Sequence, residues 1–106
     1  MKVKATKTMT RELNKVAKAS GIPYRFEYIE VPLDTYRFCI NYDYFEAYDY
    51  GDYDISTGKC KAIEVVYPSE WYACPQYLTT ARLHSLYERG DTLESYLNKV
   101  VMECEC

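Results

Sequence analysis

The amino-acid sequence predicts a single α+β domain with an N-terminal helix, an antiparallel sheet of three to four strands, and two C-terminal helices. Apolar residues recur at helical spacing before residue 20 and again after residue 78. Between these two stretches, apolar and polar residues alternate, as they do in strands with one buried face. The 106 residues suit one domain, 1–106, and we find no repeat or linker that would divide it.

The first predicted element is a helix that ends at Gly21. Either Thr8 or Thr10 can cap its N-terminus, because a hydroxyl oxygen there accepts a hydrogen bond from an otherwise unpaired backbone N–H. Its predicted buried face consists of three residues at helical spacing: Leu13, Val16 and Ala17.

The middle of the chain predicts strands. Residues 24–31 and 35–42 both alternate and are separated by the turn "PLD", so we expect them to pair as an antiparallel hairpin. Residues 59–67 are the richest in β-branched side chains and are predicted to form a central strand. The turn "DISTGKC" precedes this strand, and Gly58 can supply the positive φ that such a turn requires.

The C-terminal third predicts helices. Residues 68–79 are expected to be irregular or to carry one short helical turn. The next segment is predicted to be a helix ending at Gly90, with one side formed by Leu78, Leu83, Leu86 and Tyr87. Asp91 or Thr92 can cap the last helix. The predicted buried stripe of that helix consists of Leu93, Tyr96, Leu97, Val100 and Val101.

The chain contains no apolar run of the roughly 20 residues that a membrane span needs, and its start lacks the apolar core of a secretory signal. We therefore expect a cytoplasmic protein that does not bind membranes. The five cysteines are an odd number, which does not favour a disulfide framework. Cys39 and Cys60 are predicted to be buried in strands, and the terminal "CEC" to be a frayed, exposed end.

Charge is distributed in blocks, although the net charge is only −3. Residues 1–25 carry seven basic side chains and one acidic side chain. Residues 26–58 carry eight carboxylates and one basic side chain. Blocks of this kind often lie on different surfaces of a protein and attract different partners.

The segment "NYDYFEAYDYGDYD", residues 41–54, holds five tyrosines, five carboxylates and no Lys or Arg. Residues 42–50 fit either a strand or a helical turn, and both place a row of carboxylates in water. Tyrosines make efficient protein-binding contacts, and spaced carboxylates crudely reproduce the charge of a nucleic-acid backbone. The predicted partner-binding residues are Tyr42, Asp43, Tyr44, Glu46, Tyr48, Asp49, Tyr50, Asp52, Tyr53 and Asp54.

Metal binding and catalysis find little support in the sequence. "DYDISTG" begins like a calcium loop, but its glycine comes one residue late and Ile63 stands where the final acid is needed. The lone histidine, His84, is predicted to be a surface or boundary residue. We therefore predict no catalytic residue, no metal and no cofactor, and a protein that is not an enzyme.

The basic N-terminal block supports an alternative function. Its cations could bind nucleic acid directly, or they could simply be the solvated side of an amphipathic helix, which is the interpretation we favour. A third possibility is an assembly module that forms a homodimer, so the protein is expected to be a monomer or a homodimer. The alternative nucleic-acid-binding residues are Lys4, Lys7, Arg11, Lys15 and Lys18.

The acidic, aromatic "NYDYFEAYDYGDYD" and the α+β pattern that includes "GKCKAIEVVYPSEWYACPQYLT" resemble, at the level of a class, small proteins of phages and mobile elements of the anti-CRISPR type. These proteins share no motif, so the resemblance assigns no residue roles. It implies a non-enzymatic inhibitor that binds a nucleic-acid-handling protein, such as a CRISPR nuclease with a basic groove. The basic N-terminal block departs from a uniformly acidic mimic of DNA.

Overall fold

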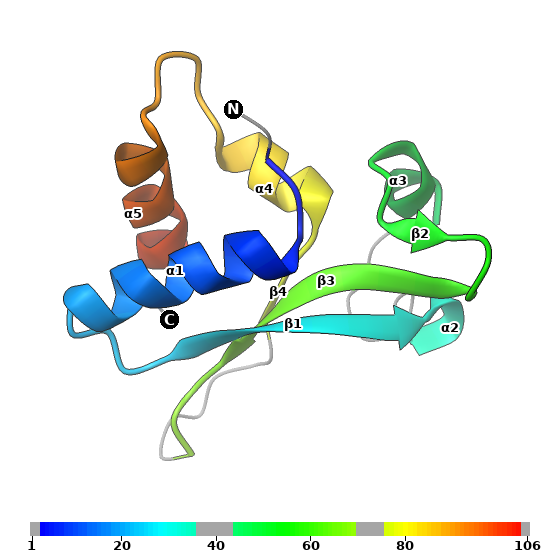
Figure 1. Ribbon diagram of the computed structural model, residues 1–106, viewed down its shortest axis with the longest axis horizontal. Coiled ribbons are helices and arrows are strands. Elements are labelled where there is room, and N and C mark those ends of the chain that lie inside the picture. The colour runs from blue at the N-terminus through cyan, green and yellow to red at the C-terminus, as the bar shows by residue number, and fades with distance from the viewer. Residues whose placement is uncertain (1–2, 36–43, 70–75, 105–106) are drawn as a thin grey trace.

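The computed structural model describes residues 3–35, 44–69 and 76–104, with the side chains of 44–46 excepted. It confirms the α+β prediction, with an N-terminal helix, a four-stranded antiparallel sheet and two C-terminal helices, and it adds two short helices (Figure 1). The helices are α1 (Lys7–Ala19), α2 (Leu33–Thr35), α3 (Tyr44–Asp49), α4 (Thr80–Leu86) and α5 (Leu93–Glu103). The strands are β1 (Arg25–Pro32), β2 (Tyr53–Asp54), β3 (Lys59–Val66) and β4 (Gln76–Leu78).

Strand β3 is the central strand, as predicted. One of its edges pairs with β1 over eight residues, from Arg25 opposite Val66 to Pro32 opposite Lys59. Its other edge pairs with β2 at one end and with β4 further along. In the described residues, the partner of β1 is therefore β3, which follows it after a long excursion of the chain. The predicted strand 35–42 lies almost entirely outside the described residues.

The predicted boundaries of two helices were wrong. Helix α1 is capped by Thr6, whose hydroxyl accepts a hydrogen bond from the backbone N–H of Met9 at 3.1 Å. Thr10 does not cap it, because its hydroxyl donates to the carbonyl of Thr6 from within the helix. Helix α4 begins at Thr80 rather than at Leu78, because Leu78 belongs to β4 and pairs with β3, and it ends at Leu86 rather than at Gly90.

The main hydrophobic core lies between one face of the sheet and the helices α1, α4 and α5. Alternation along β1 and β3 directs Phe26 and Val65 into this core, where both are 2% exposed. Leu13 from α1 and Leu83 from α4 are fully buried against them. Figure 1 shows these three helices gathered over one half of the β1–β3 pair, with α3 and β2 toward its other end.

A second, smaller cluster anchors α3 to the sheet. Ala47 of α3 and the residues Cys60 and Ala62 of β3 are completely buried and pack together. Cys60 and Ala62 alternate with Ile63 along β3, so they point to the sheet face opposite the main core. Both faces of β3 are thus buried, which explains its apolar, β-branched composition.

Tyrosine hydroxyls hold the ends of the two C-terminal helices. The hydroxyl of Tyr96 donates to the carbonyl oxygen of Leu83 in the last turn of α4, at 2.6 Å. Tyr24 donates to the carbonyl of Val101, and Tyr67 to that of Cys104 at 2.5 Å, both at the C-terminal end of α5. Carbonyls in the last turn of a helix lack the usual i+4 N–H partner, so these tyrosine hydroxyls supply a donor to each of them.

The last helix corrects two further predictions. Thr92 caps α5 in a reciprocal arrangement with Ser95, as one of the two predicted caps. Leu93 was predicted to be buried, but it is 48% exposed because it stands at the open end of the apolar stripe. Cys104 was predicted to be exposed in a frayed end, but it caps α5 and is 1% exposed within the main core.

Candidate functional site

Helix α3 and the β2–β3 turn are close to each other in the sequence, and both carry exposed apolar side chains. Residues 42–50 were compatible with a strand or a helical turn, and the structure shows a helix from Tyr44 to Asp49. The helix ends with a hydrogen bond from Asp52 N–H to the Ala47 carbonyl at 2.7 Å, while Gly51 adopts a φ of 77°. A positive φ of this kind suits glycine, so Gly51 lets the chain turn directly into β2.

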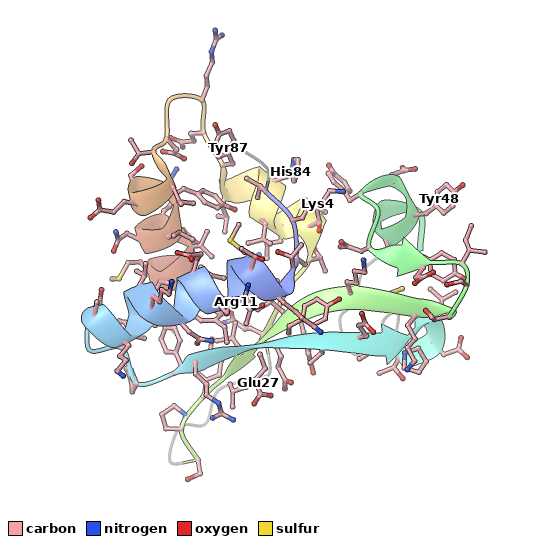
Figure 2. All side chains as sticks on the ribbon, viewed as in Figure 1. Lys4, Arg11, Glu27, Tyr48, His84 and Tyr87 are labelled. Carbon is pink, nitrogen blue, oxygen red and sulfur yellow. The ribbon has the colours of Figure 1, made fainter. Side chains whose placement is uncertain are left out.

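The exposed residues of this region form what we call the 48–55 surface, defined as Tyr48, Asp49, Tyr50 and Ile55. Tyr48 is 53% exposed, Tyr50 is 38% exposed and Ile55 is 74% exposed. Tyr48 lies on the side of α3 that is turned away from α1 and α4 (Figure 2). Three of the five large hydrophobic side chains found exposed in the described residues belong to this surface; the other two are on α5.

Asp52 was predicted to contact a partner, but the structure buries it. Its side chain is 3% exposed and accepts two hydrogen bonds from Thr80 at the start of α4, one of them from the backbone N–H at 2.9 Å. Burial raises the pKa of Asp52 above its ordinary value, even though the Thr80 hydrogen bonds and the charges of Lys61 and Lys4 act in the opposite direction. Asp52 therefore joins two parts of the fold.

The remaining predicted partner-binding residues fall into different environments. Tyr53 is half-buried and packs against the second cluster. Asp54 accepts hydrogen bonds from the backbone N–H and the hydroxyl of Ser56 in the β2–β3 turn, and these bonds lower its pKa. Tyr42 and Asp43 lie outside the described residues. Tyr44 and Glu46 lie on α3, but their side chains are outside the described part.

Two residues of this region, His84 and Ile55, were not among the predicted partner-binding residues. The ring of Tyr50 meets His84 of α4 edge to face, with ring centroids 5.3 Å apart, so α3 and α4 are neighbours at this surface. His84 is exposed, as predicted, but its place beside the tyrosines could not be seen from local sequence. Ile55 had a local signal, because it is an apolar residue within an otherwise polar turn.

Four of the predicted nucleic-acid-binding residues share helix α1, whereas Lys4 stands apart from them, with a charge that acts on Asp52. Lys4, on the segment before α1, and the four cations of α1 are all exposed. Arg11 lies in the middle of α1 and Lys4 lies on the segment leading into it (Figure 2). Lys7 stands over the ring of Tyr28, with its ammonium 5.9 Å from the ring centroid. The hydroxyl of Tyr28 donates to Glu30, and burial together with this carboxylate raises the pKa of Tyr28 to about 12.

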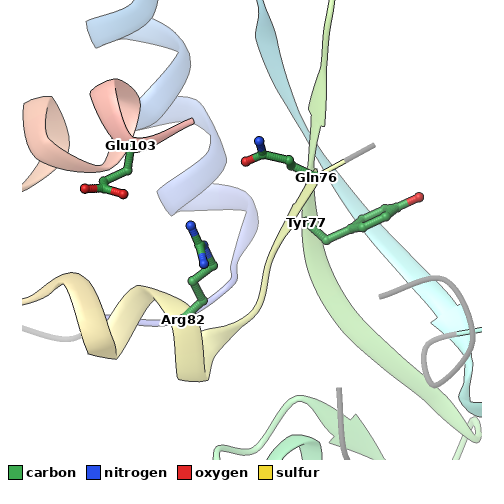
Figure 3. Close-up of a pocket in the computed structure, with 4 residues that line it drawn as sticks. All are labelled: Gln76, Tyr77, Arg82 and Glu103. Carbon is green, nitrogen blue, oxygen red and sulfur yellow. The ribbon is translucent and has the colours of Figure 1, made fainter. Parts of the chain in front are cut away.

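A cavity of about 230 Å³ lies between β4, α4 and the end of α5. Its described lining consists of Gln76, Tyr77, Arg82 and Glu103. Figure 3 shows Gln76 and Arg82 pointing toward the space between these elements, whereas Tyr77 points to the other side of its strand. The combination of a guanidinium, an amide and a carboxylate is polar, but it does not form a recognisable catalytic arrangement.

The two described cysteines, Cys60 and Cys104, are both buried as free thiols. Burial, with a smaller effect from the charge of Asp52, raises the pKa of Cys60 to about 11, so its reactive thiolate is scarce at neutral pH. Across residues 3–35, 44–69 and 76–104, no three His, Cys, Asp or Glu side chains are grouped as metal ligands would be.

None of the helices in the described residues has both the length and the apolar content that crossing a lipid bilayer demands. No protein-family model matches this sequence, and no curated protein and no solved structure shows significant similarity to it.

Proposed function

We propose that this chain is a non-enzymatic interaction protein that binds a partner protein through the 48–55 surface. The observation that carries the proposal is the exposure of Tyr48, Tyr50 and Ile55 within eight consecutive residues, while most large apolar side chains of the described residues are not exposed. Exposed aromatic side chains are typical of binding hot spots, since they offer a large contact area with little loss of conformational entropy.

The surface rests on a firmly anchored support. Ala47 is completely buried beneath α3, and the adjoining Asp52 is hydrogen-bonded to Thr80 of α4. A binding surface that is already held in place loses less entropy when a partner docks. The anchoring therefore favours recognition by Tyr48 and Tyr50 in the arrangement that they already have.

The charge around this surface suits a basic partner. The sequence contains no Lys or Arg between Cys39 and Gly58, and Asp49 is exposed beside the tyrosines. Proteins that handle nucleic acids present Lys and Arg to phosphates, so the exposed carboxylate of Asp49 complements them. We propose that the partner is such a protein. The class-level resemblance to anti-CRISPR proteins makes CRISPR nucleases the first group to test.

Asp52 is buried and Asp54 is bonded within its turn, so neither is expected to contribute much to the binding free energy. The tyrosines and Ile55 supply most of the affinity, whereas Asp49 chiefly accelerates the encounter with a positively charged groove. Asp49→Asn should therefore lower the association rate at low salt and leave the dissociation rate nearly unchanged. An equal association rate for both proteins at low salt would contradict the electrostatic part of the proposal.

The test uses the purified protein, a set of purified CRISPR nucleases, and biolayer interferometry combined with DNA-cleavage assays. Binding that blocks cleavage is expected for at least one nuclease. The double variant Tyr48→Ala/Ile55→Ala should weaken this binding at least about 30-fold, because two exposed hot-spot contacts are removed. The control is Leu93→Ala/Met102→Ala, which removes the two other exposed large hydrophobics, 48% and 55% exposed, from α5.

The control variant should bind and inhibit like the original protein. Equal weakening by both double variants would show that the 48–55 surface is not special. If the protein binds none of the nucleases, the assignment of CRISPR nucleases as its partners is wrong. If it binds one and the 48–55 variant still binds fully, the proposed surface is wrong.

A further inference from the structure

The four cations of α1 form a single stripe. Lys7, Arg11, Lys15 and Lys18 are spaced by four, four and three residues, so at 3.6 residues per turn they fall within a sector of about 80°. Their Cα atoms span about 16 Å along the helix axis. All four side chains are exposed, while the opposite side of the helix carries Leu13 into the core.

The stripe lies alongside the first half of β1, from Tyr28 back to Arg25. Near its start, Lys7 stands over the ring of Tyr28. In the middle, the Asn14 side chain exchanges two hydrogen bonds with the backbone of Phe26, at 2.9 Å and 2.8 Å. At its end, Lys18 shares the lining of a cavity with Arg25 at the beginning of β1. Helix α1 and strand β1 therefore run side by side (Figure 1).

The cavity at the end of the stripe has a volume of about 310 Å³. Ala17, Ile22 and Tyr24 give it apolar walls, and the cations Lys18 and Arg25 also line it. Ala17 and Tyr24 are each 2% exposed, so they form its deeper part. A space of this size, with apolar walls and cations beside it, suits one flat heteroaromatic ring attached to an anionic chain.

Few carboxylates neutralise the stripe. Lys15 forms an exposed ion pair with Glu12 at 3.3 Å, and such pairs are weak in water. Arg25 is paired with Glu27 at 2.9 Å. In the part of the chain that the structure describes, Lys7, Arg11 and Lys18 have no ion-pair partner, so their charges are available to an external anion.

We infer that the α1 stripe and the cavity at its end bind single-stranded nucleic acid. Phosphates of the strand contact the four cations, and an unstacked base enters the cavity beside Lys18. Single strands suit this arrangement better than duplexes, because a base in a duplex is paired and cannot enter the cavity without being flipped. The inference does not depend on the 48–55 surface, which lies on other elements.

The test measures fluorescence anisotropy of a labelled single-stranded DNA of about 20 nucleotides, at salt concentrations from about 50 to 200 mM. Four phosphate contacts predict a slope of log affinity against log salt of about −3 for a single strand. A duplex of the same length and sequence should bind at least about tenfold more weakly, despite its higher charge density. Absence of binding at the lowest salt, or equally tight binding of the duplex, would overturn the inference.

Two matched double variants locate the contact. Arg11→Gln/Lys15→Gln removes two cations of the stripe and should reduce the salt slope to about −1.4. Lys59→Gln/Arg89→Gln removes two exposed cations from other parts of the molecule and should leave both slope and affinity nearly unchanged. Equal effects of the two variants would show that net charge, and not the α1 stripe, determines binding.

The cavity is tested separately by Ile22→Trp, which fills it, and by Lys18→Gln, which keeps its shape and removes one neighbouring charge. The filled cavity should abolish the preference for single strands over duplexes. Lys18→Gln should weaken single-strand binding and reduce the slope by about 0.7. Circular dichroism verifies that each variant is folded, and if Ile22→Trp is not, the smaller change Ile22→Phe replaces it. A folded, filled variant with the original preference would overturn the role of the cavity, and an unchanged Lys18→Gln would overturn the contact of Lys18 with phosphate.

The variant Tyr48→Ala/Ile55→Ala should bind the oligonucleotide like the original protein. The proposal of partner binding by the 48–55 surface and the proposal of single-strand binding by the α1 stripe can therefore fail independently.

Discussion

Thr80 donates two hydrogen bonds to the carboxylate of Asp52, one from its backbone N–H and one from its hydroxyl. The same hydroxyl oxygen accepts a bond from the backbone N–H of Ala5 at 2.9 Å. All three residues are buried, with exposures of 1% to 3%. The start of α4 is thereby fastened both to the segment before α1 and to Asp52, which lies between Tyr50 and Ile55 of the 48–55 surface.

The first prediction is that Thr80→Val destabilises the protein by about 3 kcal/mol. Valine has nearly the same shape as threonine, but it leaves the Ala5 N–H and one Asp52 oxygen buried without their partner, and each such loss costs about 1–3 kcal/mol. The measurement is urea unfolding followed by circular dichroism. The control is Thr8→Val at an exposed position on α1, which should change the free energy of unfolding by less than about 0.5 kcal/mol. Similar values for the two variants would contradict the importance of the buried hydroxyl.

The second prediction concerns pH. The pKa of Asp52 in the folded protein lies above its ordinary value of 3.8, chiefly because of burial, so the folded state holds this proton more tightly than the unfolded state. The resulting contribution to stability is fully present below the pKa of the unfolded chain and is lost as the pH rises through the raised, folded pKa. Asp52→Asn lacks this titration and isolates it from that of the other acids.

The free energy of unfolding of the original protein, minus that of Asp52→Asn, should therefore decrease as the pH rises from about 3.5. Urea unfolding of both proteins at a series of pH values measures this difference. An increase with pH would mean that the hydrogen bonds from Thr80 outweigh the desolvation of the carboxylate, and that its pKa is lowered.

The third prediction concerns the tyrosines that hold helix ends. Tyr96→Phe should destabilise the protein by about 1–2 kcal/mol, because the carbonyl of Leu83 loses a buried donor 2.6 Å away. Tyr50→Phe removes a hydroxyl from a side chain that is 38% exposed and should have almost no effect on stability. Urea unfolding of both variants provides the comparison. Equal stability of the two variants would show that the hydrogen bond from the Tyr96 hydroxyl to the Leu83 carbonyl does not increase the free energy of unfolding.

The sequence predicted the elements whose signals are local. The alternation around Phe26 and the apolar spacing of Leu13, Val100 and Val101 correctly identified the buried faces of β1, α1 and α5. The N-terminal end of α1 nevertheless differs from the prediction, because a cap depends on one hydrogen bond. Thr6 rather than Thr8 caps α1, since its hydroxyl faces the N–H of Met9.

The candidate site was less predictable, because burial depends on distant partners. Asp49 and Asp52 stand in the same acidic, aromatic segment, yet one is exposed and the other is buried. Thr80 makes the difference, and it follows Asp52 by 28 residues. The tyrosines behave in the same way: the backbone carbonyls that receive the hydroxyls of Tyr24 and Tyr96 carry no signal in the sequence.

The pairing of β1 with β3 also has a consequence for how the chain reaches its folded form. Its eight residue pairs, from Arg25–Val66 to Pro32–Lys59, all join positions that are distant along the chain. Bringing such positions together costs loop-closure entropy before any contact compensates for it, whereas helices form from near neighbours. We therefore expect α1, α4 and α5 to be nascent early, and the closing of the β1–β3 ladder to set the rate at which the molecule folds.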